Sequence, residues 1–429
     1  MAPMTRILII ADDLSGAADC ASAFARTGMD SLVVFGDDAA QADEACVLAI
    51  DADSRRLPAA EAARIHQALQ ARYYAEGMLL YLKIDSTLRG NFAAELAAIA
   101  PGAGLAIVAP AFPKAGRTTR NGRQYLHGIP LEQSDMWRVE GMDGAADIPA
   151  MLERRGVRTV AIGLPALRQP TASVLALFAA LARDGVQAVV CDAETDDDLS
   201  LIAEASLQLP TRCFWVGSAG LATQLAIALR QASPVTAAAS MEADVRGAIL
   251  TVVGSMSGVS REQARQLGAA TTMACVDVAV SVLRGGPLDA GWLALQQRLS
   301  AALQQGRDLL LTIAEDTAVD IDEGVLLCQA LARLVAPLTA GVGALIATGG
   351  ETARALLCEM GCYGLRLAAE IEPGVPLSVA AGPRALAVIT KAGAFGSADT
   401  LLACYRTLAA ARRSTASSLP TPLHPLKGH

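Results

Sequence analysis

Tyr81 to Asn91 read YLKIDSTLRGN, and this stretch, with the residues on either side of it, decides the fold that we expect. Met78–Ile84 (MLLYLKI) is an almost unbroken apolar run, which predicts a buried strand, whereas Asn91–Ala100 (NFAAELAAIA) predicts a helix. Strands that alternate with helices are typical of a parallel α/β sheet. The polar residues between the two segments therefore lie at the carboxyl end of the strand, where such sheets bind ligands.

The turn carries more chemistry than its backbone requires. A plain strand-to-helix turn needs one cap and one glycine, which Asp85, Ser86 or Asn91 with Gly90 would supply, leaving Arg89 in solvent. Five chemically capable residues instead fall within nine positions. We therefore predict a ligand site at this turn.

Length and composition restrict the class of protein. A chain of 429 residues predicts two or three domains, and 53% hydrophobic with 4% aromatic residues suits α/β layers. A net charge of −8 argues against nucleic acid as a partner. The longest uncharged run, Leu96–Pro113, contains three prolines and is not expected to span a membrane.

The N-terminal sequence and the cysteines predict a cytoplasmic protein. The apolar stretch in MAPMTRILIIADD is too short for the core of a signal peptide and runs straight into acidic residues, so we interpret it as the first strand. Nine cysteines form no CxxC pair, and the closest two, Cys358 and Cys362, have no histidine beside them. Free thiols in a reducing compartment are expected.

Helix and strand patterns divide the chain in two. The prediction is an α/β fold of two α/β domains with mainly parallel sheets and a ligand cleft between them. We place the first domain at 1–231, a linker that loses periodicity at 232–246, the second domain at 247–412, and a disordered tail at 413–429. Pro110–Pro130, rich in glycine and basic residues, is predicted to be a long irregular loop with a function.

Acidic and basic residues follow the other early strands. Asp12 and Asp13 come at the end of the first strand, where they could hold a substrate hydroxyl, accept its proton or reach a metal, although Asp12 could equally be a helix cap. Arg55 follows the strand that ends at Asp51. Together with Arg89 it would form a fork for a carboxylate, since guanidinium groups bind planar anions through two bonds.

Three loops of small residues follow strands in the second half: Gly254–Gly258 (GSMSG), Thr348–Thr352 (TGGET) and Lys391–Gly396 (KAGAFG). Small residues at the start of a helix allow backbone amides to approach a phosphate, and the helix dipole adds to the attraction. Ordinary glycine caps would explain any one of them, but three together predict a nucleotide pocket. The motifs GxxxxGK[ST], GxGxxG, HExxH and GxSxG are absent from the expected places.

Taken together, a series of motifs in this order resembles the four-carbon acid sugar kinase family. They are ADDLSGAAD (Ala11–Asp19), DSR (Asp53–Arg55), KIDSTLRGN (Lys83–Asn91), APAFPKAGRTTRNGRQYLHGIPL (Ala109–Leu131), TGGETA (Thr348–Ala353), EIEPGVPL (Glu370–Leu377) and TKAGAFG (Thr390–Gly396). The resemblance implies an N-terminal acid-substrate domain, a C-terminal ATP-binding domain, and phosphorylation of the terminal (C4) hydroxyl of a tetronate. The KxDSTLRGN form looks like that of the threonate and erythronate kinases. On this resemblance we expect D-threonate as the substrate, with D-erythronate and 3-oxo-tetronate as alternatives.

The resemblance also implies site residues. The acid-binding positions are Asp12, Asp13, Arg55, Lys83, Ile84, Asp85, Ser86 and Arg89, and the nucleotide-binding positions are Ser255, Gly349, Gly350, Glu351, Thr352 and Gly393. Our hypothesis is that Arg55, Lys83 and Arg89 hold the sugar acid, that Asp13 or Asp85 accepts the proton of the attacking hydroxyl, and that Mg²⁺ accompanies ATP. The metal ligands stay unassigned, and a homodimer stays open.

Two rival functions are compatible with these patterns. A sensor that closes around a sugar acid would need no nucleotide, so ATP binding distinguishes it from a kinase. An aldolase or isomerase acting on phosphorylated sugar acids would use the glycine loops for a substrate phosphate, and it would not release ADP when a tetronate is added.

Overall fold

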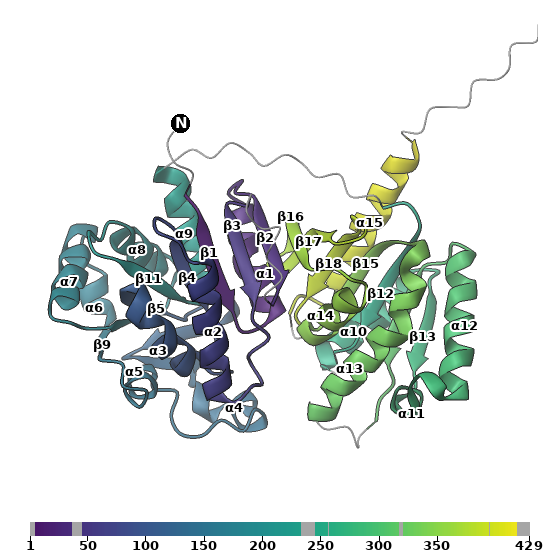
Figure 1. The fold of residues 1–429 in the computed structure, drawn as a ribbon, viewed down its shortest axis with the longest axis horizontal. Helices are drawn as coiled ribbons and strands as arrows, with labels where there is room; N and C mark the ends of the chain where they lie inside the picture. The colour runs from purple at the N-terminus through teal and green to yellow at the C-terminus, as the bar shows by residue number, and fades with distance from the viewer. Residues whose placement is uncertain are drawn as a thin grey trace, which may run out of the picture. The chain divides into compact units, whose positions relative to one another are not determined.

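The computed structural model describes residues 5–36, 45–232, 245–255, 257–316, 321–393 and 395–417 (Figure 1). They belong to two compact units, one of Met1–Ala239 with Tyr363–Ala369, the other of Ser240–Cys362 with Glu370–His429. Most of the expected linker, residues 233–244, lies outside the described residues. The sequence analysis placed all of 247–412 in the second domain, whereas Tyr363–Ala369 belongs to the first unit.

Unit 1 contains a parallel sheet in the strand order β2-β3-β1-β4-β11-β5-β10-β9. Its strands are β1 (Ile7–Ala11), β2 (Ser31–Phe35), β3 (Val47–Asp51), β4 (Leu79–Lys83), β5 (Leu105–Ala109), β9 (Thr159–Ile162), β10 (Ala188–Cys191) and β11 (Cys213–Gly217). Every residue of β1, β2, β3 and β5 is buried. Continuous apolar strands of this kind are expected where helices cover both faces of a parallel sheet.

The helices of unit 1 alternate with its strands. They are α1 (Leu14–Ala25), α2 (Ala59–Tyr73), α3 (Phe92–Ala103), α4 (Asp135–Val139), α5 (Ile148–Glu153), α6 (Leu164–Leu167), α7 (Thr171–Arg183), α8 (Asp196–Leu207) and α9 (Ala219–Ala232). The three short ones, α4, α5 and α6, were not predicted from the sequence. α1 packs against α9, and α2 packs against α3. The mixed α/β fold with mainly parallel strands is therefore confirmed.

The interpretation of 110–130 as an irregular loop is wrong. β6 (Arg117–Arg120), β7 (Arg123–Leu126) and β8 (Ile129–Pro130) form a small antiparallel sheet. Asn121-Gly122 joins β6 to β7, and His127-Gly128 joins β7 to β8; all four residues have positive φ. Two-residue turns with positive φ at both positions match the twist of antiparallel strands, and Asn-Gly is their strongest sequence signal. That signal was present in the sequence and was overlooked.

Unit 2 repeats the parallel arrangement with the order β13-β14-β12-β15-β18, to which β17 adds in antiparallel orientation. Its strands are β12 (Ala248–Val253), β13 (Ala274–Val278), β14 (Leu309–Ile313), β15 (Val342–Thr348), β17 (Val375–Ala381) and β18 (Ala387–Lys391). Its helices are α10 (Gly258–Ala270), α11 (Val280–Gly285), α12 (Ala290–Gln304), α13 (Ile321–Val335), α14 (Gly350–Glu359) and α15 (Thr400–Ser417).

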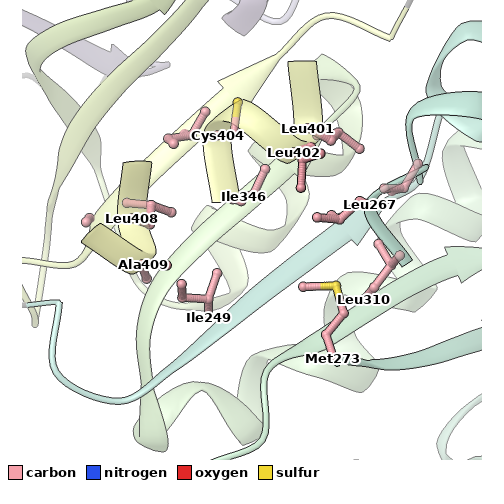
Figure 2. Close-up of a cluster of buried hydrophobic side chains, with 14 of the residues drawn as sticks. Ile249, Leu267, Met273, Leu310, Ile346, Leu401, Leu402, Cys404, Leu408 and Ala409 are labelled. Carbon is pink, nitrogen blue, oxygen red and sulfur yellow. The ribbon is translucent and has the colours of Figure 1, made fainter. Parts of the chain in front are cut away.

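A cluster of buried side chains joins α10 and α15 to this sheet (Figure 2). Ile249 and Ile346 come from the central strands, and Leu401 and Leu408 from α15. Complete burial of a side chain of this kind stabilises the folded state by about 1.5–3 kcal/mol relative to leaving it exposed. The C-terminal helix is therefore part of the core of unit 2.

Two further segments differ from the sequence-based expectations. β16 (Gly364–Glu372) pairs antiparallel with β2, with Gly364 opposite Val34, and neither β16 nor β17 was expected as a strand. α15 continues to Ser417, so 413–417 is helical and the expected tail is not disordered there, while residues 418–429 lie outside the described part.

One described stretch, Glu323–Gly341, is long and apolar enough to cross a membrane by length and composition alone. Leu327, Leu331 and Leu334 from this stretch are buried inside unit 2. This is the burial expected of an amphipathic core helix.

Candidate functional site

The polar residues predicted in unit 1 meet at one edge of its sheet. β1 lies between β3 and β4, and Ala11, the last residue of β1, is paired with both Asp51 and Lys83, the last residues of its neighbours. The loops that follow these strands carry the acidic and basic side chains of the predicted site. Strand order thus brings together residues that are far apart in the sequence.

The guanidinium of Arg55 lies among the carboxylates of Asp12, Asp13 and Asp85. Its Nε and Nη2 donate to the two oxygens of Asp12 at 2.7 and 2.9 Å, and its Nη1 donates to Asp13 Oδ2 at 2.7 Å. Nη1 also lies 3.7 Å from Asp85 Oδ2. Burial alone would lower the pKa of Arg55, but the three carboxylates raise it well above its usual value. Arg55 is therefore held by acidic residues, and the carboxylate that it shares with Arg89 in this structure is that of Asp85.

Asp85 organises the turn that follows β4. Its Oδ1 accepts from the backbone N and the hydroxyl of Thr87, both at 2.7 Å, and its Oδ2 accepts from Arg89 Nε at 2.6 Å. Burial by itself would raise the pKa of Asp85, but the positive charges of Arg89, Arg55 and Lys83 hold it well below its usual range. Asp85 is consequently an ionised carboxylate whose oxygens are already occupied.

Asp13 differs from its neighbours in exposure. Its Oδ1 caps α1 by accepting from Gly16 N at 2.9 Å, as a carboxylate at a helix N-terminus does. Its side chain is 23% exposed, against 2% for Asp12 and 8% for Asp85. Of the three carboxylates, Asp13 is therefore the one that a ligand reaches most easily.

Lys83 is a further cation at this edge of the sheet, and it differs from Arg55 and Arg89 in its interactions. No hydrogen bond or ion pair engages its ammonium within the described ranges, and the residue is 5% exposed. A Cβ on Gly16 would lie 2.5 Å from Lys83 Nζ, so the ammonium lies against the first turn of α1. Glycine at position 16 therefore makes room for it.

The remaining predicted positions, Ile84 and Ser86, lie in the same turn. The side chain of Ile84 is fully buried, and its backbone N donates to Gly217 O at 2.9 Å. The carbonyl of Ser86 accepts from Gln124 Nε2 at 2.7 Å, which links the turn to β7. Both positions are part of the scaffold of the turn.

Arg117, at the start of β6, was not among the predicted site residues. Its pKa is lowered by burial, and Asp85 and Arg89 are the charges that act on it. It therefore adds a further cation beside the turn. The basic character of 110–130 was the sequence signal that could have identified it.

A buried polar cluster that the sequence analysis also missed lies behind Arg55. The hydroxyl of Ser54 lies 3.0 Å from His66 Nε2 and donates to Glu95 Oε1 at 3.0 Å. Burial lowers the pKa of His66 to about 3 and raises that of Glu95 to about 8, with the charge of Asp12 adding to the second shift. The three residues are separate in sequence, so no local pattern announces them.

In unit 2, the three glycine loops are brought to one edge. β15 lies between β12 and β18, and Thr348, its last residue, is paired with Val253 and with Lys391. The loops after all three strands are therefore neighbours, as the expected nucleotide pocket requires.

Close approach of neighbouring side chains explains two of the glycines in these loops. A Cβ on Gly254 would lie 2.0 Å from Thr352 Oγ1, and a Cβ on Gly393 would lie 2.1 Å from Ser255 Oγ. Gly349 has a φ of 92° and precedes α14, which no side chain caps. The N-terminus of such a helix attracts anions.

Individual side chains of this edge have different roles. Thr352 is 1% exposed and its hydroxyl donates to Cys328 Sγ at 3.2 Å, so the side chain faces the interior. Gly350 and Glu351 form the first turn of α14 together with Thr352. Ser255 Oγ accepts from Ser257 N at 3.3 Å within the first loop and also lies against Gly393 of the third loop.

Neither edge has a preformed metal site: among the described residues, no group of three or more His, Cys, Asp or Glu side chains is arranged to hold an ion. Mg²⁺ commonly binds one or two carboxylates together with substrate phosphates. All nine cysteines are free thiols, as expected from their spacing.

Comparisons with known proteins agree with this division. A family model for a sugar-binding N-terminal domain matches residues 7–225, and one for a nucleotide-binding C-terminal domain matches residues 250–401. A crystal structure of a Salmonella typhimurium LT2 protein has a TM-score of 0.80 at 22% identity, covering 95% of this chain and 100% of that one, which shows the common fold.

Curated relatives give the family. A D-threonate kinase of Cupriavidus necator is 47% identical over 95% of this chain and 99% of its own length. A D-threonate kinase of Bordetella bronchiseptica is 34% identical, covering 92% and 95% of the two chains. A 3-oxo-tetronate kinase of Methylobacterium radiotolerans is 32% identical, covering 91% and 96%. With a sugar-binding half and a nucleotide-binding half matched over nearly its whole length, this chain belongs to the four-carbon acid sugar kinase family.

Proposed function

We propose that this kinase transfers the γ-phosphoryl group of ATP to the C4 hydroxyl of D-threonate, giving 4-phospho-D-threonate and ADP. The observation that carries the proposal is the 47% identity to a D-threonate kinase over 95% of the chain. The edge of unit 1 that carries Lys83 and Arg89 could bind a sugar acid. The glycine-lined edge of unit 2, formed by the loops after β12, β15 and β18, could bind a nucleotide. We also propose that the enzyme acts in the cytoplasm, where ATP is available and its nine free thiols stay reduced.

Asp13 is the residue that we assign to the proton of the attacking hydroxyl. Its side chain is 23% exposed, and Arg55 fixes its orientation through a 2.7 Å hydrogen bond. Asp85 is a poorer candidate, because its two oxygens already accept from Thr87 and Arg89 and its pKa is held low. A carboxylate with a strongly lowered pKa is a weak general base.

Lys83 and Arg89 are the groups that we assign to the carboxylate and hydroxyls of the sugar acid. The Lys83 ammonium has no partner to give up within the described chain. Arg89 is 34% exposed, and its bond to Glu140 is long, at 3.4 Å. Arg55 has the separate task of orienting Asp12 and Asp13.

The glycine loops are assigned to the phosphates of ATP. Backbone amides around Ser255, Gly349 to Thr352 and Gly393 offer donors of the kind that phosphate oxygens accept, and the uncapped start of α14 adds a favourable dipole. Mg²⁺, when bound, would offset the charge of the phosphates. Phosphoryl transfer depends mainly on such positioning and electrostatic stabilisation.

The proposal is tested by measuring ADP release with D- and L-threonate, D- and L-erythronate and 3-oxo-tetronates. We expect the highest kcat/KM with D-threonate. Faster turnover of D-erythronate or of a 3-oxo-tetronate would keep the kinase but replace its substrate. If ATP does not bind, or if no acid stimulates ADP release, the sensor or the aldolase reading takes the place of the kinase.

The roles of the two carboxylates are tested with Asp13→Asn and Asp85→Asn. Loss of a positioned general base lowers kcat by about 10²–10⁴-fold, and we expect this for Asp13→Asn with KM for the acid little changed. Asp85→Asn should mainly lower the melting temperature, since Arg89 loses its carboxylate. Near-normal kcat in both variants would show that neither accepts the proton.

A further inference from the structure

Lys391 is a buried cation that opens the KAGAFG loop at the glycine-lined edge, but it was not among the predicted nucleotide-binding residues. It is the last residue of β18 and is 2% exposed. Its Nζ donates to three backbone carbonyls of the following loop, those of Ala392 at 2.9 Å, Gly393 at 3.1 Å and Phe395 at 3.0 Å. The loop thus folds its carbonyl oxygens around the lysine.

The count of donors decides what this lysine does. An ammonium has three N–H groups and no acceptor, and each of the three has a carbonyl here. Burial lowers the pKa of Lys391 to about 8, so the ammonium is still the main form at neutral pH. No N–H of Lys391 is left to donate to a phosphate oxygen in this conformation.

The carbonyl of Gly393 is the centre of the arrangement. Besides Lys391, the hydroxyls of Ser257 and Ser260 donate to it at 2.9 and 2.7 Å. Gln263 Nε2 donates to Phe395 O at 3.1 Å and to Ser397 O at 2.6 Å, so α10 fixes the loop at two further points. The loop is therefore held from the inside by side chains of α10 and by Lys391.

Because the loop directs its carbonyl groups toward Lys391, the amide that shares a peptide group with such a carbonyl points away from Lys391. The peptide group is planar and trans, so the N–H of Gly393 points away from the carbonyl of Ala392, which Lys391 holds. Among the described residues the N–H of Gly393 has no partner. Gly393 itself lies against the first glycine loop, since a Cβ on Gly393 would lie 2.1 Å from Ser255 Oγ.

We propose that Lys391 is a positioning residue of the nucleotide site: it holds the carbonyls of Ala392, Gly393 and Phe395 inward, presents the Gly393 amide to a nucleotide phosphate, and makes no phosphate contact itself. The inference rests on the proposed function, because it needs this edge to bind the nucleotide. It separates Lys391 from the lysines that many nucleotide-binding loops direct at the β- and γ-phosphates.

The test compares Lys391→Met with Arg384→Met in the full chain. Arg384 is a matched control in the same unit, because it also donates to three backbone carbonyls, those of Thr339, Ala340 and Val342, but before β18 and not after it. Calorimetric titrations with ATP and with ADP give the affinities. For Lys391→Met we expect both affinities to fall by the same factor of about ten, which corresponds to about 1.4 kcal/mol, while Arg384→Met changes neither by more than about twofold.

A lysine that contacts the γ-phosphate would give a different result. Loss of a γ-phosphate contact weakens ATP much more than ADP, and that outcome would overturn the inference, as would unchanged affinity for both. A contact with the β-phosphate would weaken both nucleotides and is distinguished by its additivity with Ser260→Ala. In steady-state assays we expect Lys391→Met to raise KM for ATP and to leave KM for the acid unchanged.

Ser260→Ala provides a second, milder variant. It removes one donor to the Gly393 carbonyl without removing a charge. If Lys391 acts through that carbonyl, the effects of Ser260→Ala and Lys391→Met on nucleotide affinity are not additive; full additivity contradicts the proposal. If Lys391→Met does not fold, as judged by circular dichroism, an equal weakening of ATP and ADP by Ser260→Ala supports it and no effect refutes it. Failure of the wild-type protein to bind any nucleotide overturns the proposed function instead.

Discussion

Arg55→Met is expected to destabilise unit 1 strongly, because it leaves a buried carboxylate without its counter-ion. The variant removes three charge-assisted hydrogen bonds of 2.7, 2.9 and 2.7 Å. Asp12, which receives two of them, is 2% exposed and cannot recover hydration. Removing one partner of a buried ion pair costs about 3–5 kcal/mol, and we expect a loss of this size in the free energy of unfolding.

A double-mutant cycle separates the ion pair from the loss of packing. Asp12→Asn removes the negative charge but keeps the shape, so the double variant Asp12→Asn/Arg55→Met has no buried charge left without a partner. Its destabilisation should be smaller than the sum of the two single effects by about 0.5–3 kcal/mol. The coupling energy measures the pair directly.

Urea denaturation followed by tryptophan fluorescence is suited to this measurement. The chain has three tryptophans, of which Trp137 and Trp215 belong to unit 1 and Trp292 to unit 2. In a Trp292→Phe background the fluorescence reports on unit 1 alone. The transition then gives the stability of the unit that contains Arg55.

Arg168→Met is the matched control. Arg168 also binds a carboxylate through two bonds, to Asp198 at 2.7 and 2.9 Å. Asp198 is 2% exposed, like Asp12, but Arg168 is 47% exposed and Asp198 keeps backbone donors from Glu194 and Thr195 when the arginine is removed. We expect a loss of at most about 1 kcal/mol. Equal effects of the two arginine variants, or an additive cycle at Asp12 and Arg55, would refute the reasoning about buried charge.

Two further predictions concern the glycine loops and the buried cluster. Gly254→Ala should weaken ATP binding in titration experiments, because its Cβ would lie 2.0 Å from Thr352 Oγ1, and Thr352→Ala should restore part of the affinity; no rescue would contradict a steric cause. The pKa of Glu95 is raised from 4.5 to about 8, so between these two pH values the folded state keeps a proton that the unfolded chain loses. The contribution of Glu95 to the free energy of unfolding therefore falls as pH rises through this window. Glu95→Gln should remove the fall between pH 6.5 and 8, where His66, whose pKa is lowered from 6.5 to about 3, no longer contributes an opposite slope. A slope that persists in Glu95→Gln would assign it to other groups.

Local sequence patterns were sufficient for the fold class and for the positions of the loops. Apolar runs such as ILIIA in β1 and LLYLK in β4, each followed by a polar turn and a helix, determine parallel strands because such runs are stable only when both faces are covered. The patterns also placed the glycine loops correctly after β12, β15 and β18. The sequence also carries the signal for the turn at Asn121-Gly122, but that signal was overlooked.

Contacts between distant residues were decided by the tertiary structure alone. The order β3-β1-β4 brings Asp12, Arg55 and Asp85 together, so Arg55 is bound by carboxylates of the protein itself, which the sequence did not predict. The return of β16 to β2 likewise depends on a pairing across a long sequence separation, and so do the bonds that Ser257 and Ser260 donate to the carbonyl of Gly393. Periodicity records which face of a segment is buried, whereas the identity of the neighbour is fixed only when the whole sheet packs.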